Sequence, residues 1–337
     1  MAAIIADYYV DPVTGADTND GLTTTTPFAT FQKGANMATA GQTVALKANG
    51  LTADEFPTTM LEFNINEGGS AGCIKYIGVN SSWEHDGSKY ILDGSALTSI
   101  INIDKDRLVF HSIELRNAIG SPLDTASSTR GSLITWYNCV FRNNGNKVDF
   151  QQCGEVFIFA CASIGNDGTG FAPSYYNKSF IAFCSSIGNT GSGISVSPNS
   201  SYTQTIIGCL CCDNGSTGIY AKYGTSLLLQ NTCDGNGSYG VYSTDETTLI
   251  ANRLTNNEGY GVGVGTLTVR GVSAFNFFSN NVVGVEMGEP CKLLGTDGLD
   301  TNIYTGIIGY SSPGSPDYDY NLTADATMRD IAITLPS

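Results

Sequence analysis

The sequence has few basic residues and only two histidines. It contains 16 Lys and Arg against 31 Asp and Glu, a formal net charge of −15 over 337 residues. Surfaces that bind nucleic acid are basic, so we expect no direct nucleic-acid binding. His85 and His111 stand outside any metal-ligand spacing, so we also expect no zinc site.

Long apolar segments are missing too. No stretch approaches 18 consecutive apolar residues, so we expect no membrane insertion. The opening segment 1–7 has neither the charged region nor the long apolar region of a secretory signal peptide. Either a leader has been removed, or the protein is made in a host cytoplasm without a signal peptide and stays there until it is released.

One sequence motif is repeated seven times between Trp136 and Gly288, and equivalent positions of the aligned repeats form columns. A first column holds Cys or Asn, and a second column holds Asn five residues later. The first column contains Cys139, Cys161, Cys184, Cys209, Asn231, Asn252 and Asn276. The second contains Asn144, Asn166, Asn189, Asn214, Asn236, Asn257 and Asn281. Successive copies are 22, 23, 25, 22, 21 and 24 residues apart, which is too short for a two-helix repeat and suits one coil of a β-solenoid.

Period-two alternation around the first column predicts the strands. We expect the residues two positions before and two positions after this column to share its inward face. The residues two positions before it are Tyr137, Phe159, Ala182, Ile207, Leu229, Ile250 and Ala274. The second-column Asn is expected at a turn, where Asn tolerates left-handed backbone, with its amide stacked on those of neighbouring coils.

These features predict an all-β chain, a right-handed single-stranded parallel β-helix with coils of about 22 residues. We expect residues 1–60 to form an entrance strand, a loop and an N-terminal capping helix. Residues 61–288 should form the β-helix, and residues 289–337 a C-terminal cap or docking tail. A cap is needed because an open solenoid end exposes unpaired strand edges.

The capping helix is expected over 27–40. Pro27 would follow the N-cap Thr26, and Gly41 would end the helix. Its apolar stripe contains Phe28, Phe31, Ala35 and Ala38. In the loop before it, Asp17, Asn19 and Asp20 offer oxygen ligands for Ca²⁺, although their spacing does not match the EF-hand loop. A hydrogen-bonded turn is the alternative, and no other cofactor is expected.

The ten cysteines are expected to be free thiols. Four occupy the first column, and Cys211 and Cys233 stand two residues beyond it, where cysteine acts as a small buried hydrophobic residue. Stacked side chains that point in parallel fit disulfide torsions poorly. Free thiols favour cytoplasmic synthesis. Cys212 should point outward and be the most reactive thiol.

Several segments resemble a known group. The opening YYVDPVTGADTNDG…TPFATFQKGANMATAGQTVAL is similar to the entrance segment of pectate-lyase-like right-handed β-helix proteins. GCIKYIGVN…YILDG…INIDKDRLVFHSIELRNA is similar to the early coils of that superfamily, so the resemblance extends over about residues 7–288. The tail SSPGSPDYDYNLTADATMRDIAITLP resembles endings of phage-encoded members. Because the superfamily includes lyases, glycoside hydrolases, bacteriophage tailspikes and non-enzymatic virion proteins, the resemblance implies a fold and leaves the function open.

Acidic residues at the turns are the candidates for catalysis. A β-helix hydrolase needs two or three carboxylates about 5–10 Å apart. The resemblance implies that a calcium-dependent lyase would need grouped carboxylates and a Lys or Arg base. The acids near the second column are Asp167, Asp213, Asp234 and Glu258, of which Asp213 and Asp234 lie on neighbouring coils. Turn charges also keep a solenoid soluble, so both interpretations stay open.

Outward tyrosines are the candidates for binding. Tyr220 and Tyr242 stand one coil apart, each after a residue expected inward, and Tyr239 and Tyr260 lie in the same turns. Such a surface can stack on sugar rings or pack against a partner subunit. Isolated surface tyrosines are the alternative.

We therefore expect a structural or adhesive protein of a bacteriophage virion surface, without catalytic activity: a capsid decoration, a fibre or a tailspike-like β-helix. Its expected partners are itself, as a homotrimer, other virion proteins and host surface glycans. The alternative is a polysaccharide lyase or glycoside hydrolase on the same scaffold.

Overall fold

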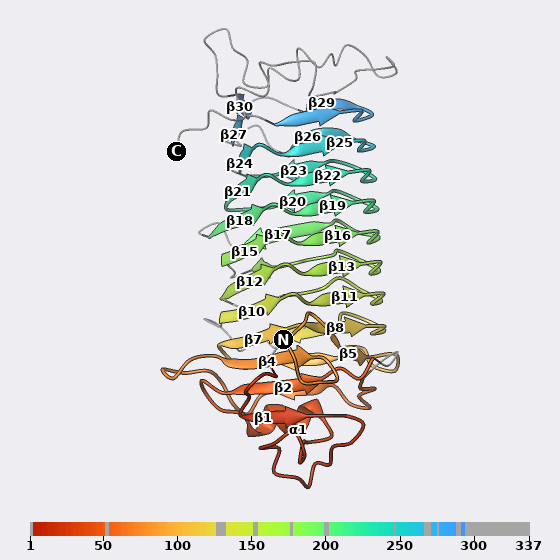
Figure 1. Cartoon of the computed structure of the whole chain (residues 1–337). Coiled ribbons are helices and arrows are strands. Elements are labelled where there is room, and N and C mark those ends of the chain that lie inside the picture. Colours follow the sequence, from red (N-terminus) through yellow and green to blue (C-terminus); the bar gives the residue numbers. More distant parts are fainter. Residues whose placement is uncertain are drawn as a thin grey trace.

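The chain folds into one long stack of short strands (Figure 1). The computed structural model describes residues 3–50, 54–125, 133–150, 154–175, 178–198, 202–245, 247–265, 271–274, 276–287 and 291–293. The described strands form a 12-stranded, a 9-stranded, a 6-stranded and a 3-stranded sheet. Neighbouring strands in each sheet are parallel. This confirms the predicted parallel β-helix.

After the first coil, which contributes β1 alone, the described coils up to β29 each contribute strands to two or three sheets. The 12-stranded sheet contains β1 (Tyr8–Val10), β2 (Thr43–Lys47), β4 (Ile74–Val79), β7 (Leu108–His111), β10 (Leu133–Tyr137), β12 (Glu155–Phe159), β15 (Lys178–Ala182), β18 (Thr203–Ile207), β21 (Thr225–Leu229), β24 (Thr247–Ile250), β27 (Gly271–Ala274) and β30 (Cys291–Leu293). The 9-stranded sheet contains β5 (Tyr90–Asp93), β8 (Ile113–Arg116), β11 (Val140–Arg142), β13 (Ala162–Ile164), β16 (Ser185–Ile187), β19 (Leu210–Cys212), β22 (Thr232–Asp234), β25 (Arg253–Thr255) and β28 (Phe277–Ser279).

The other two sheets are smaller. The 6-stranded sheet contains β14 (Ser174–Tyr175), β17 (Ile194–Pro198), β20 (Ile219–Ala221), β23 (Val241–Ser243), β26 (Tyr260–Val264) and β29 (Gly284–Met287), and the 3-stranded sheet contains β3 (Leu61–Phe63), β6 (Ile101–Ile103) and β9 (Leu123–Thr125). Because β1 and β2 already belong to the 12-stranded sheet, the stack begins before the predicted boundary at residue 61. The predicted tail, 289–337, lies outside the described residues apart from 291–293.

The expected inward position of the column that begins at Tyr137 is wrong. Tyr137 is 39 % exposed, whereas Trp136 beside it is fully buried. A left-handed residue at the corner between the 12-stranded and 9-stranded sheets interrupts the alternation, so period two holds only within one strand. The left-handed corner residues are Asn138, Ala160, Phe183, Gly208, Gln230 and Ala251. The inward column is Trp136, Ile158, Ile181, Ile206, Leu228 and Leu249.

The second column forms the expected amide ladder. Asn189 Nδ2 donates to Asn214 Oδ1, and Asn214 Nδ2 donates to Asn236 Oδ1, both at 3.0 Å. Equivalent links join the column from Asn144 to Asn281, and all its members are buried. The left-handed residue is the one before the ladder Asn in these coils, such as Asp213 at φ 53, so the expected left-handed position is displaced by one residue.

The first column is buried as expected, and sulfur replaces the amide oxygen in its early coils. The Cys139 and Cys161 N–H groups donate to the Sγ of the next cysteine, at 3.3 and 3.4 Å. Later in the column, Asn231 N–H donates to Asn252 Oδ1 at 2.9 Å. The eight cysteines with described side chains are free thiols, and Cys212 is partly exposed.

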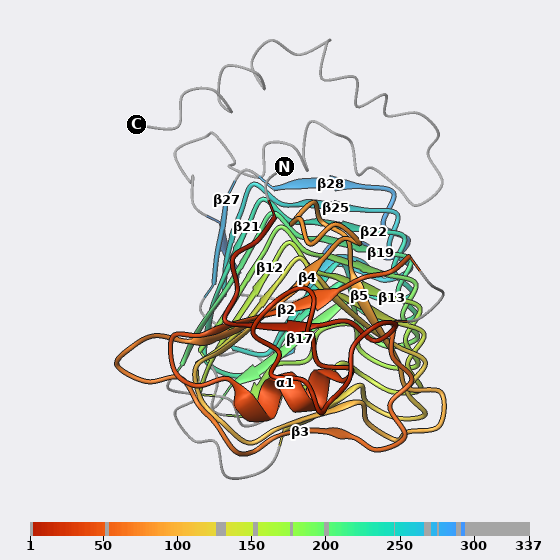
Figure 2. The same ribbon diagram turned by 60° about the horizontal axis from the view of Figure 1, so that its bottom comes forward.

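A short helix, α1 (Phe31–Met37), lies at the N-terminal end of the stack (Figure 2). The expected start at Pro27 is wrong, because the Thr30 hydroxyl caps the helix by accepting from Lys33 N–H. The apolar stripe is buried, and α1 packs against β1, β2 and β3. Its capping role stays a prediction. Within the described ranges, no helix is long and apolar enough to cross a membrane.

Candidate functional site

The four predicted tyrosines form one cluster on the outside of the 6-stranded sheet. Tyr220 and Tyr242 are paired across β20 and β23, with ring centroids 5.3 Å apart. Tyr239 lies 4.9 Å from Tyr242 and 6.2 Å from Tyr260, and its ring is nearly parallel to that of Tyr260, at 8°. All four are partly exposed. The cluster exists because Ile219 and Val241 point inward, so the next residue in each strand points outward.

Glycines make room for these rings. Gly263 is paired with Tyr242 in the next strand, and a Cβ at Gly263 would lie 2.7 Å from both Tyr239 and Tyr242. A Cβ at Gly265 would lie 2.7 Å from the Tyr242 hydroxyl oxygen. The rings therefore lie against bare backbone. The result is an aromatic surface with hydroxyl groups, an arrangement suited to a ligand with both apolar and polar faces.

Asp213 and Asp234 lie on neighbouring coils next to Cys212: the Asp213 N–H donates to the Asp234 carbonyl at 3.0 Å, and Cys212 is paired with Asp234 across β19 and β22. Burial raises the pKa of the Cys212 thiol to about 11, and the charges of Asp234 and Asp213 add to the effect. Asp234 also accepts from Asn256 Nδ2 at 2.7 Å and from the Thr255 hydroxyl. A high thiol pKa makes Cys212 a poor nucleophile at neutral pH. The two carboxylates remain the best-placed acidic pair among the predicted residues.

Asp167 and Glu258 are not brought together. Asp167 lies in the turn of the coil that contains Cys161, and its carboxylate accepts from the Thr190 hydroxyl at 2.9 Å. Glu258 lies four coils further along, which at about 4.8 Å per coil is about 19 Å away. Since paired catalytic carboxylates lie about 5–10 Å apart, these two residues cannot form one glycosidase site.

The proposed calcium ligands are used within the N-terminal loop. Asp17 accepts from the Thr30 hydroxyl at 2.8 Å and from its N–H at 3.0 Å. Asn19 Nδ2 donates to the carbonyl of Pro27 at 2.8 Å, and Asp20 accepts from the Thr26 hydroxyl at 2.7 Å. These contacts fit the hydrogen-bonded turn. In the part of the chain that the structure describes, no three His, Cys, Asp or Glu residues are grouped as metal ligands.

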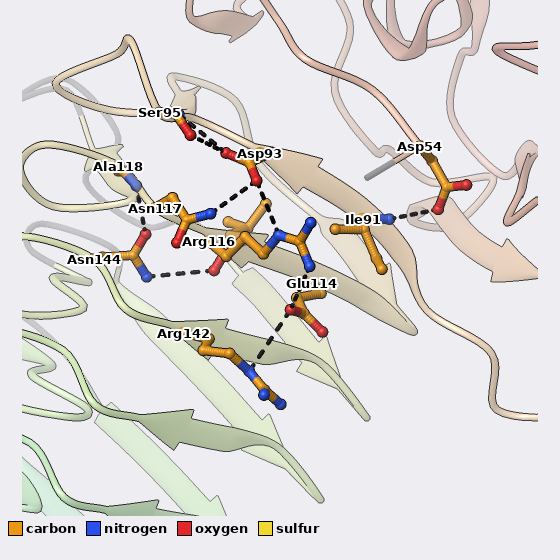
Figure 3. A network of polar contacts seen from close by, with 11 residues as sticks. Asp54, Ile91, Asp93, Ser95, Glu114, Arg116, Asn117, Ala118, Arg142 and Asn144 are labelled. Carbon is orange, nitrogen blue, oxygen red and sulfur yellow. Dashed lines mark hydrogen bonds and ion pairs between the residues drawn. The ribbon is translucent and has the colours of Figure 1, made fainter. Parts of the chain in front are cut away.

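A charged network on the outside of β5, β8 and β11 is absent from the sequence predictions (Figure 3). Arg116 Nε donates to Asp93 Oδ2 at 3.0 Å, and Glu114 Oε1 lies 3.8 Å from Arg116 Nη1 and 3.7 Å from Arg142 Nε. Burial raises the pKa of Asp93, but donors led by the Ser95 hydroxyl outweigh it and lower that pKa. A carboxylate held ionised is a poor general acid. The network therefore has a structural role, because its ion pairs link the coils that contain β5, β8 and β11. The sequence signal for this network was the alternation of apolar and polar residues in YILD (90–93) and IELR (113–116).

The two histidines also meet in the folded chain. Their ring centroids are 4.3 Å apart, and His111 lies 4.5 Å from the Tyr137 ring. Burial lowers the pKa of His111 to about 4, helped by the nearby charges of His85 and Lys89. His111 is therefore neutral at neutral pH. The separation of 26 residues between the two histidines gave no sign of this contact.

Comparison with known proteins agrees with the fold. The family model described as a right-handed β-helix region matches residues 124–283. The crystal structure of pectate lyase Pel9A is similar with a TM-score of 0.63 and 17 % identity, covering 86 % of this chain and 83 % of that one. A rhamnogalacturonan lyase has a TM-score of 0.44 and 17 % identity, covering 84 % and 74 %, and Geobacillus virus E2 ORF18 has 0.42 and 11 %, covering 77 % and 58 %.

Among curated proteins, none matches this chain. At 17 % identity, the likeness to pectate lyase Pel9A shows the fold alone. The chain is thus a right-handed parallel β-helix, which confirms the fold predicted from the sequence.

Proposed function

We propose that this chain is a structural, adhesive protein of a bacteriophage virion surface, which binds a ligand without converting it. The observation that supports this proposal most is the cluster of Tyr220, Tyr239, Tyr242 and Tyr260, gathered from three successive coils. The resemblance of the tail to endings of phage-encoded β-helix proteins supports the virion assignment. The proposal includes a capsid decoration, a fibre and a tailspike-like protein, each of which could use an exposed binding surface.

The proposed ligand is a host surface glycan. The C–H face of a sugar ring packs on an aromatic face, and tyrosine hydroxyls exchange hydrogen bonds with sugar hydroxyls. The net charge of −15 repels polyanions, so a neutral glycan suits this protein better than an acidic one.

A polysaccharide lyase or glycoside hydrolase is the second candidate. It is favoured by one observation, the position of Asp213 and Asp234 on neighbouring coils beside Cys212. In that case the two carboxylates would act as acid and as base or nucleophile. In each coil the carboxylate precedes the second-column Asn and the tyrosines follow it, so variants can test the two sites separately.

A panel of neutral and acidic bacterial polysaccharides tests the proposal on the full chain. Binding is measured by calorimetry, and turnover by new reducing ends and by absorbance of unsaturated products. We expect binding without turnover, weakened at least tenfold in Tyr239→Ala and Tyr242→Ala. Tyr137→Ala, on another side of the solenoid, is the matched control and should bind like the wild type. Turnover that disappears in Asp213→Asn or Asp234→Asn would establish the enzyme instead.

The virion location is tested separately. We expect mass spectrometry of purified phage particles to detect the chain, and gold-labelled antibody to mark the particle surface. A chain found in the lysate and missing from particles would refute the location without affecting the binding result.

A further inference from the structure

The chain contains four Asn–Gly sequences, and three of them lie in the amide ladder. The four are Asn49–Gly50, Asn144–Gly145, Asn214–Gly215 and Asn236–Gly237. An asparagine that precedes glycine is especially prone to spontaneous deamidation, because glycine has no side chain to hold its main-chain nitrogen away from the asparagine amide. Whether such a pair reacts in a folded protein depends on the freedom of its atoms to reach one another.

The reaction takes place within one Asn–Gly pair and needs only water. The glycine nitrogen loses its proton and attacks the side-chain carbonyl carbon of the asparagine. The new N–C bond closes a succinimide ring, and the side-chain amide nitrogen takes up a proton and leaves as ammonia. Water then opens the ring at either carbonyl, which gives aspartate or isoaspartate. The glycine N–H and the asparagine amide must therefore both be free to move.

The three ladder pairs are held away from this reaction. The Gly215 N–H donates to the Asn189 carbonyl at 2.8 Å. The buried Asn214 amide is bonded on both sides, since Asn214 Oδ1 accepts from Asn189 Nδ2 and Asn214 Nδ2 donates to Asn236 Oδ1, both at 3.0 Å. The glycine bonds of the other two pairs, also at 2.8 Å, run from Gly145 to the Ala118 carbonyl and from Gly237 to the Asn214 carbonyl. Closing the succinimide ring would require breaking these bonds and unstacking the coil.

The pair Asn49–Gly50 follows β2 and lies outside the ladder. Gly50 is exposed, its backbone is left-handed at φ 71, and a Cβ placed on it would meet no atom within 4 Å. Asn49 is partly exposed, and its Nδ2 donates to Asp11 Oδ1 at 3.2 Å and to the Lys47 carbonyl at 3.3 Å, longer than the ladder's amide-to-amide bonds of 2.8–3.0 Å. Because glycine changes its backbone angles at little cost, Gly50 has the room to turn its nitrogen toward the Asn49 amide.

We propose that Asn49–Gly50 is the site at which the folded chain deamidates, and that the amide ladder protects the other three Asn–Gly pairs. The inference goes beyond the proposed function and does not depend on it, since the site lies at the N-terminal end of the stack and uses none of the residues of the tyrosine cluster.

The product changes the charge balance around Asp11. Burial raises the pKa of Asp11, but hydrogen bonds led by those from Lys47 and Thr14 outweigh it and lower that pKa to about 2, so this carboxylate is ionised. An aspartate at position 49 replaces an amide that donates to Asp11 with a second carboxylate. Asp54 already accepts from the Asn49 N–H at 2.8 Å, so a third carboxylate is close. Repulsion among them should loosen the ends of β1 and β2.

Peptide mapping by mass spectrometry tests the inference on the full chain, kept either folded or unfolded in urea at mildly alkaline pH. In urea all four pairs should deamidate at similar rates. In the folded chain Asn49 should react within about tenfold of its rate in urea, whereas the ladder asparagines should be slowed at least about a hundredfold, because a buried coil is open in only a small fraction of molecules. An Asn49 that stays intact in the folded chain, or ladder asparagines that react as fast as Asn49, would overturn the inference.

Two variants test the site and the protection separately. Asn49→Ser has no side-chain amide at this position, so ion-exchange chromatography of the aged, folded protein should no longer show the acidic species that accumulates in the wild type. Asn214→Leu interrupts the ladder and should accelerate deamidation of Asn236 without changing the rate at Asn49. An acidic species that still forms in Asn49→Ser would assign the modification to another residue, and an unchanged rate at Asn236 would contradict protection by the ladder.

The effect of the product is tested by Asn49→Asp, which has the same charge as the deamidated chain. Hydrogen exchange should accelerate in β1 and β2 of this variant. Asn146→Asp adds the same charge at an exposed turn and is the matched control, so its exchange in β1 and β2 should equal that of the wild type. Equal exchange in the two variants would refute the predicted repulsion around Asp11.

Discussion

The replacement Asn214→Leu should break the amide ladder in the middle of the stack. Asn214 Oδ1 accepts from Asn189 N–H at 3.2 Å and from Asn189 Nδ2 at 3.0 Å. Asn214 Nδ2 donates to Ser186 O and to Asn236 Oδ1, both at 3.0 Å. A leucine side chain can neither accept nor donate these hydrogen bonds. Asn189 Nδ2 keeps Ser163 O and Ser186 Oγ as acceptors, and Ser186 O keeps its place in the parallel pairing of β16 with β19, so the main loss falls on Asn189 N–H.

These losses set the expected magnitude. An unpaired buried polar group costs about 1–3 kcal/mol, and this is the expected cost of leaving Asn189 N–H without an acceptor. In a solenoid, each coil is stabilised by its neighbours, so the loss should appear in the adjacent coils as well.

Urea denaturation and hydrogen exchange measure the effect. We expect the free energy of unfolding to fall by about 1–3 kcal/mol and amide exchange to accelerate in the coils that contain Asn189 and Asn236. Asn146→Leu, at an exposed turn, is the matched control and should change stability by about 0.5 kcal/mol or less. An Asn214→Leu protein with the stability and exchange of the wild type would show that the stacked amides contribute nothing.

Four further predictions concern the thiols and His111. Cys209→Asn should preserve or raise stability in urea, because its amide would extend the column in which Asn231 Nδ2 donates to Asn252 Oδ1 at 3.0 Å, whereas Cys209→Val should lower stability. A thiol reagent should label Cys212 and the partly exposed Cys73 before Cys161, Cys184 and Cys209; disulfides in that column would contradict this order. Because the pKa of Cys212 is about 11, its labelling rate should still rise about tenfold per pH unit near pH 9–10, and Asp234→Asn should increase the rate at fixed pH. The pKa of His111 is about 4 and that of an unfolded histidine about 6.5, so the unfolded chain binds the proton first and stability should fall between about pH 6.5 and 4. His111→Phe should remove this part of the pH dependence in thermal denaturation, and an unchanged slope would show that His111 is not responsible.

The sequence by itself determined the type of fold. In a solenoid each coil contacts only its neighbours, so equivalent residues stack and the repeat is visible as columns. The fixed interval of five residues between Cys139 and Asn144 predicted two buried columns, and both are buried. The amide ladder followed from the same columns. The outward positions of Tyr220 and Tyr242 followed from alternation within a single strand, where period two holds.

Only the tertiary structure shows which side chains point inward in the strands before and after each corner. Nothing in Ala160, Phe183 or Gln230 signals left-handed backbone, yet all three adopt it and end the alternation of the strand before them. An apolar column that begins at Tyr137 therefore looks buried in the sequence and lies on the outside. Hydrophobicity alone cannot distinguish an apolar residue that points inward from one that points outward.

Contacts between coils were also decided only by the fold. The network of Asp93, Glu114, Arg116 and Arg142 depends on the register of β5, β8 and β11, whose residues are more than 20 positions apart in the chain. The start of α1 depends on the Asp17 carboxylate, which accepts from Thr30 across 13 residues. The repeat fixes the order and spacing of the coils. The side-chain contacts of the irregular segments depend on backbone angles and distances that become defined only when the stack has formed.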